Sequence, residues 1–165
     1  MLKLFLCVMV ILSSTLVGNW YSVRISHRRR DIFLLIEAIE KMKNYISFGG
    51  YEIRCVVSNS FSSADGFKMF VLDDNLEVGF ESWWSESVKN LKNTTALNSE
   101  DIELLLKFGN SLGVTDVEGQ IANCDLYKTL FSKRFNTAEN AECKNFRLYR
   151  ILGFSFGCVI TLIVL

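Results

Sequence analysis

Residues 104–120 read LLLKFGNSLGVTDVEGQ, the pattern of an amphipathic helix that ends, a short break and a second helix that begins. Apolar or small residues fall on one helical face at spacings of three and four: Ile102, Leu105, Leu106, Gly109, Leu112 and Gly113. Gly113 suits the position just after a helix, where glycine adopts a left-handed backbone at little cost. Thr115 and Glu118 have capping-box spacing, and Asp116 adds negative charge at the positive end of the second helix. The stretch predicts a tight helix–helix corner.

The segments on either side of this corner extend both helices. Asn98 is a favourable N-cap for the first helix and is followed by acidic residues. We expect the second helix to begin at Asp116 and to continue to the C-terminus, because the chain has no proline to interrupt it. A heptad-like seam along it steps through Val117, Ile121, Cys124, Lys128, Phe131, Phe135, Ala138 and Glu142. This seam predicts a long helix lying along a bundle.

Upstream of the corner, helical periodicity continues. An apolar stripe begins after Asp31 and runs through Ile32, Leu35, Ile36, Ile39, Met42 and Ile46. No helix-breaking residue separates it from the N-terminal apolar run, so the two are expected to form one helix that Gly49-Gly50 ends. Residues 52–64 form a shorter amphipathic helix. Residues 67–76 and 78–91 lack alternation of period two and are also predicted to be helices.

Trp83 and Trp84 are adjacent and cannot face the same way on a helix. Either one fills the core and the other marks a surface, or both lie in the core at a crowded helix junction. Taken together, the predicted segments indicate an all-α fold, an antiparallel bundle of about five to six helices.

Composition limits the classes of function. The 165 residues carry a formal net charge of zero, so no overall field favours nucleic acid. The five cysteines are an odd number without C-x-x-C spacing, and His27 is the single histidine. This pattern argues against structural zinc and against a disulfide framework, and favours free thiols in a reducing compartment.

Both ends of the chain are strongly apolar. The run from Leu4 to Val17 is long enough, with its flanking residues, to cross a bilayer. The alternative is a secretory signal peptide, but the positive charges follow the run, and no small-residue cleavage site is evident. The chain ends in a second apolar run, residues 151–165. We therefore predict an N-terminal span at residues 1–23, a helical domain at 24–150 and a C-terminal span at 151–165.

Charge sets the predicted topology. The cations that follow the first run or precede the second are Arg24, Arg28, Arg29, Arg30, Arg147 and Arg150. They place the domain in the cytoplasm and both termini across the membrane. Small residues four apart would let the spans pack closely, namely Ser14 with Gly18 and Gly153 with Gly157.

No sequence pattern for catalysis stands out. The chain lacks a phosphate-binding loop, a zinc-protease motif and a nucleophile elbow. Asp73-Asp74 and Glu100-Asp101 are neighbours that diverge on a helix, so each is better explained as a solvated face or a cap. We expect no enzyme activity, no cofactor, no metal and no small-molecule substrate.

Several motifs resemble the stage III sporulation protein AB family over nearly the full length. Ser13 to Gly18 reads SSTLVG, close to the family's S-S-T-L-I-G, and Leu148 to Gly153 matches its entry into the second span. The most specific element is Leu112-Gly113-x-x-Asp116-x-x-x-Gln120, preceded by Gly109. These motif residues are therefore candidates for an interaction site.

The resemblance implies a sporulation protein in the mother cell membrane facing the forespore. The family's helical domain is similar to the cytoplasmic domain of the type II secretion platform protein. Its expected partners are a secretion-type ATPase, other membrane proteins of the same sporulation operon, and membrane lipid. The implied role is a non-enzymatic scaffold that docks the ATPase in a secretion-like complex. The alternative is a lone membrane-anchored lipid-binding or sensor module that uses the arginine cluster.

Overall fold

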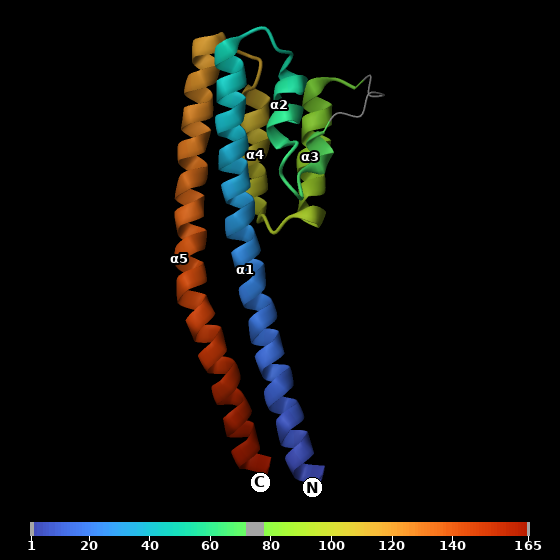
Figure 1. The fold of residues 1–165 in the computed structure, drawn as a ribbon, viewed down its shortest axis with the longest axis vertical. Helices are drawn as coiled ribbons and strands as arrows, with labels where there is room; N and C mark the ends of the chain where they lie inside the picture. Colours follow the sequence, from blue (N-terminus) through green and yellow to red (C-terminus); the bar gives the residue numbers. More distant parts are fainter. Residues whose placement is uncertain (1, 72–77, 165) are drawn as a thin grey trace. The chain divides into compact units, whose positions relative to one another are not determined.

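The computed structural model describes the backbone of residues 2–71 and 78–164, and the side chains of residues 9, 13, 23–71, 78–144 and 155. Every regular element in these ranges is helical (Figure 1). In chain order they are α1 (Leu2–Phe48), α2 (Ile53–Phe61), the 3-10 turn η1 (Lys68–Phe70), α3 (Phe80–Thr94), α4 (Ser99–Ser111) and α5 (Val117–Val164). The predicted all-α class is confirmed for the described residues.

The chain divides into two compact units, and α1 and α5 contribute to both. One unit is Arg28–Asn136, which is called the helical unit below. The other combines Met1–His27 with Thr137–Leu165. The domain boundaries drawn from the sequence, after residues 23 and 150, stay predictions.

Helix α1 is continuous through the basic segment, as the lack of a helix breaker predicted. It ends at Phe48, where Gly49 and Gly50 adopt φ values of 71° and 82°. Only glycine adopts this left-handed backbone without steric cost, so the predicted end of the helix is confirmed. The core-facing stripe of α1 is fully buried at Ile32, Leu35, Ile39 and Met42.

The seam of α5 packs against α1 within the helical unit. Its buried members in this unit are Cys124 and Phe131, and Ala138, which is also buried, belongs to the other unit. The polar member Lys128 forms an ion pair with Glu40 of α1 at 2.6 Å. A second ion pair joins Lys43 of α1 to Asp125 at 2.7 Å, and the carboxylate raises the pKa of Lys43 above its ordinary value. Apolar packing and ion pairs together hold the two helices side by side.

The tryptophan pair belongs to the core, the second of the two alternatives. Trp83 and Trp84 are both buried in α3. The indole Nε1 of Trp84 donates to the carbonyl oxygen of Leu105 at 3.2 Å, which ties α3 to α4. Its ring also lies against Phe70 and Phe108, with centroids 4.9 and 6.1 Å away.

The helix predicted over residues 67–76 is wrong in its described part, where only Lys68–Phe70 form a 3-10 turn. Phe67 and Phe70 both stack on Phe61, with ring centroids 5.5 and 4.5 Å away. Residues three apart align along a 3-10 turn, so this turn brings both rings onto one partner. Residues 72–77 lie outside the described part of the chain. Helix α3 then runs from Phe80 to Thr94, three residues beyond the predicted end.

The two predicted membrane spans involve mostly residues whose side chains are not described. Across the part of the chain that was searched, no helix is both long and apolar enough to cross a bilayer. The flanking spans therefore stay predictions. The same holds for the expected packing pairs and the two distal arginines, whose side chains lie outside the described residues: Ser14, Gly18, Gly153, Gly157, Arg147 and Arg150.

Candidate functional site

The corner between α4 and α5 begins with a tight turn. Helix α4 ends at Ser111, and Leu112 follows with φ −75° and ψ 135°. Gly113 then has φ 77°, so the two residues match the central positions of a type II turn. Leu112 is buried and anchors the turn to the core. The left-handed glycine predicted at this corner is confirmed.

The predicted Thr115–Glu118 capping box is wrong, because α5 begins one residue later, at Val117. Asp116 caps it instead, and its Oδ1 accepts from the backbone N–H of Gly119 at 2.9 Å. A carboxylate at the positive end of a helix combines the cap with a favourable charge, which a threonine hydroxyl cannot supply. The backbone oxygen of Thr115 is used differently, as the acceptor for Gln120 Nε2.

Gly109 allows a close contact inside the helical unit. A Cβ at this position would lie 1.9 Å from the indole Nε1 of Trp84. Any larger residue would therefore displace a buried ring. Gly113, by contrast, has nothing within 4 Å of such a Cβ, so of these two glycines Gly109 alone is required by a close contact.

Gln120 has one satisfied and one unsatisfied amide atom. Its Nε2 donates to the Thr115 carbonyl oxygen at 3.2 Å. Its Oε1 is buried and has no hydrogen-bond partner among the described groups. A buried acceptor without a partner costs roughly 1–3 kcal/mol. The corner geometry leaves this atom unexplained, which marks Gln120 for function.

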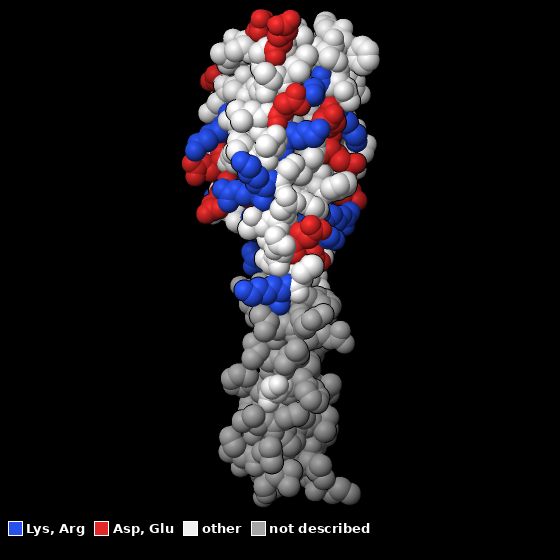
Figure 2. All heavy atoms as spheres, turned by 90° about the vertical axis from the view of Figure 1, so that its left-hand side faces the viewer, with Lys and Arg blue, Asp and Glu red and all other residues white. Residues whose placement is uncertain are grey.

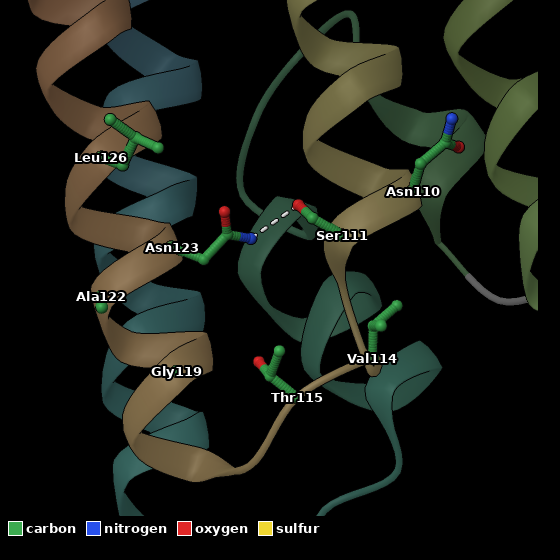
Figure 3. A pocket seen from close by; sticks show the side chains of 8 residues that line it. All are labelled: Asn110, Ser111, Val114, Thr115, Gly119, Ala122, Asn123 and Leu126. Atoms are coloured by element: carbon green, nitrogen blue, oxygen red, sulfur yellow. Dashed lines mark hydrogen bonds between the residues drawn. The ribbon is translucent and has the colours of Figure 1, made fainter.

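The motif residues thus stabilise the corner from within, whereas other residues of α4, of α5 and of the link between them form its surface. A groove of about 510 Å³ lies between the end of α4 and the first turns of α5 (Figure 3). Its lining residues are Asn110, Ser111, Val114, Thr115, Gly119, Ala122, Asn123 and Leu126. Asn123 Nδ2 donates to Ser111 Oγ at 2.6 Å across it. Val114 and Leu126 are 72% and 55% exposed, so sequence periodicity alone missed an apolar surface.

A second cleft of about 340 Å³ adjoins the corner and shares Thr115 with the groove. It lies between the end of α1, the Gly49–Tyr51 link and the start of α5. Figure 2 shows charges of both signs over the face of the helical unit that α5 forms, with acidic side chains at the end where α5 begins. In the described part of the chain, no group of three or more His, Cys, Asp or Glu side chains is arranged to hold a metal ion.

The other end of the helical unit holds a partly buried ion pair that no sequence pattern predicted. Arg28 Nε and Nη2 donate to the two carboxylate oxygens of Asp101 at 2.8 and 3.1 Å. Asp101 is fully buried and also accepts from the Asn98 N–H, completing a capping box. Arg28 lies four residues before Ile32, on the core face of α1, and this position was the available signal. Arg24 and Arg30 are exposed.

Comparison with known proteins gives a consistent result. The model of the stage III sporulation protein AB family matches residues 3–165. Stage III sporulation protein AB of Bacillus subtilis (strain 168) is 25% identical over 171 residues, covering both chains fully. A solved structure of stage III sporulation protein AB (SpoIIIAB) shares the fold, with a TM-score of 0.62 and 22% identity over 72% of this chain and 98% of that chain. The chain therefore belongs to the stage III sporulation protein AB family.

Proposed function

We propose that the protein is a non-enzymatic scaffold that docks a secretion-type ATPase at the mother cell membrane facing the forespore. Two apolar terminal spans anchor it, and the helical unit presents a docking surface in the cytoplasm. Other membrane proteins of the sporulation operon complete the complex. The proposal extends the family membership to a molecular role.

The groove at the α4–α5 corner carries this proposal. Val114 and Leu126 expose apolar surface on its walls, and the Asn123–Ser111 hydrogen bond crosses it. Exposed apolar residues with nearby polar groups are typical of protein interfaces. The corner beneath is held by Leu112, the Asp116 cap and the contact of Gly109 with Trp84. A rigid surface of this kind binds a partner without first being ordered.

Co-purification of the full chain, solubilised in detergent, with the ATPase of the same operon tests the proposal. Val114→Asp and Leu126→Asp place charges on the groove walls and should abolish capture. Val71→Asp is the matched control, because Val71 is 43% exposed and does not line the groove. Circular dichroism of each variant checks that it is folded. Equal capture by all variants, or no capture by the folded wild type, would overturn the proposal.

The placement in the membrane needs its own measurement. Cys143 is exposed and suits labelling from either side of the membrane, whereas Cys124 is buried and does not. A membrane-impermeant maleimide added to intact cells should leave Cys143 unlabelled until the cells are opened. Labelling of intact cells would contradict the cytoplasmic placement.

The lipid-binding alternative is tested with the exposed arginines alone. Arg28 is held by Asp101, so replacing the whole arginine cluster would damage the fold as well as any lipid contact. Arg24→Gln with Arg30→Gln removes only exposed cations. If the scaffold proposal is right, this double variant still captures the ATPase.

A further inference from the structure

The second cleft, which we call the Gln120 cleft, has a defined wall composition. It is lined by Tyr45, Ile46, Gly49, Gly50, Tyr51, Ile53, Val56, Gly113, Thr115, Asp116, Val117 and Gln120. Its volume of about 340 Å³ is near the lower end of the ~300–1,000 Å³ typical of ligand pockets. A space of this size suits one or two side chains of a partner.

The amide of Gln120 offers an acceptor in this cleft. Because the carbonyl oxygen of Thr115 can only accept, the atom facing it must be Nε2, which fixes Oε1 as the atom without a partner. Gln120 lines the cleft, and the terminal torsion of glutamine is broad, so rotation of the amide turns Oε1 towards an incoming donor at the expense of the bond from Nε2 to Thr115. The cleft therefore favours a ligand that donates hydrogen bonds.

The charges around the cleft favour a cation. Asp116 supplies a carboxylate in its wall. The C-terminal end of α1 brings the negative end of its helix dipole, whereas α2 and α5 begin in the same wall with their positive ends, so the Asp116 carboxylate is the one formal charge among the lining residues. No Lys or Arg occurs in residues 44–53 or 108–127.

The neighbouring cations are engaged elsewhere or stand apart. Lys43 is paired with Asp125, and Arg54 lies over the ring of Trp83 at 5.9 Å. Lys41 is exposed one turn before Tyr45 and does not line the cleft. The negative groups of the cleft are therefore not neutralised by a cation in its own wall.

Two tyrosines complete the wall. Tyr45 and Tyr51 pack edge to face with ring centroids 5.9 Å apart. Tyr51 is also 59% exposed. Aromatic rings beside a carboxylate and a carbonyl acceptor form the environment that guanidinium and ammonium groups favour.

We propose that the Gln120 cleft is a socket for a single Lys or Arg side chain carried by the docked protein partner. This inference rests on the proposed function, since it names the group by which the ATPase engages the corner. The cation pairs with Asp116, donates to Gln120 Oε1 and lies against Tyr51. Docking thereby gives Gln120 Oε1 a partner that no described group of the protein supplies.

Binding of the purified ATPase to the detergent-solubilised full chain tests the socket with three variants. Asp116→Asn keeps the capping oxygen and removes the charge, so it should weaken binding roughly tenfold or more, the value of a charge-assisted hydrogen bond. Gln120→Met should also weaken binding while leaving the fold intact. Glu118→Gln is the matched control, because it removes a neighbouring charge that does not line the cleft, and binding should change less than about twofold.

A second arm is independent of the ATPase. The side-chain amide signal of Gln120 is followed by NMR while N-acetyl-arginine amide is added, with the uncharged N-acetyl-citrulline amide as comparison. Only the arginine compound should shift the signal, and Asp116→Asn should abolish the shift.

The outcomes separate the two proposals. If the ATPase binds wild type and all three variants equally, the socket is wrong and the scaffold stands. If the ATPase does not bind wild type, the scaffold is wrong, and the arginine–citrulline difference decides the socket. Equal shifts with both compounds would overturn it.

Discussion

The N-termini of α4 and α5 use the same local device and differ in everything around it. Both helices are capped by the side chain of an Asn or Asp, Asn98 in one and Asp116 in the other. At α4, the Asp101 carboxylate is buried and bonded to Arg28 and to the Asn98 N–H. At α5, Asp116 is exposed and the nearby Gln120 Oε1 has no partner among the described groups.

This difference separates a part built for stability from a part built for contact. At the start of α4, the carboxylate oxygens of Asp101 are already bonded to groups of the protein itself, so they are not available to a partner. The α5 start keeps an open carboxylate, an unsatisfied acceptor and exposed apolar side chains at Val114 and Val117. Polar groups without internal partners and exposed apolar side chains at one end of a bundle are typical of a binding surface.

The substitution expected to have the largest effect on stability is Arg28→Met, which tests the α4 side of this comparison. It leaves Asp101 buried without its cation, and we expect a loss of about 3–5 kcal/mol in the free energy of unfolding. The double variant with Asp101→Asn should recover much of it, because the buried charge is then gone. Denaturant unfolding followed by tryptophan fluorescence measures both. Lys107→Met, which removes an exposed ion pair with Glu103, is the control and should change little; an equal loss there would contradict the role of Arg28.

The next largest effect tests the interior support of the corner. Gly109→Ala drives a methyl group into the indole of Trp84 and should cost about 3 kcal/mol by overpacking. Gly113→Ala has open space but a left-handed backbone, so we expect about 1 kcal/mol. The same unfolding measurement compares them. If Gly113→Ala costs more, the turn limits the stability of the corner and the close α3–α4 contact does not.

Caps come third. Asn98→Ala removes one capping acceptor and should cost about 1–2 kcal/mol. Asp116→Ala should cost about 1 kcal/mol, and Asp116→Asn only about 0.3 kcal/mol, because asparagine caps as well as aspartate and only the favourable charge at the helix N-terminus is lost. The stability of the three variants is compared at neutral pH. A large loss for Asp116→Asn would mean that the charge of Asp116 serves the fold and is not free for a partner.

The smallest effect concerns Cys124, one turn beyond Gln120. Burial raises the pKa of its thiol to about 11, so little reactive thiolate forms at pH 8. Among the three cysteines whose side chains are described, site-resolved labelling with a maleimide should modify Cys143 first, then Cys55, and Cys124 last. Because the folded pKa lies above the ordinary value of 9.0, Cys124 contributes stability that is lost as pH rises from 9 towards 11. Early labelling of Cys124 would show that solvent reaches the side of α5 that is buried in the structure.

Local sequence patterns correctly predicted the features that depend only on residues close together in the chain. The Asn98 cap, the left-handed Gly113 and the end of α1 at Gly49 follow from residue type and spacing. The Arg28–Asp101 pair joins residues 73 apart, and no local pattern predicts which carboxylate an arginine will meet. Thr115 was predicted as the cap and Asp116 is the cap, because both residue types suit that position and local spacing does not show which residue the helix begins after. The unsatisfied Oε1 of Gln120 depends on three-dimensional packing, so sequence could only mark the residue as unexplained.

The ion pairs that join α1 to its partners have a consequence for how the chain folds. Glu40 pairs with Lys128 across 88 positions, and Lys43 with Asp125 across 82. Contacts between α3 and α4 are local by comparison and are available early in synthesis. Helix α1 is made first, but Glu40 and Lys43 meet their partners only when α5 emerges from the ribosome, after the other helices. Folding of the helical unit is therefore expected to wait for its final segment, and that interval is when the chain is most exposed to aggregation.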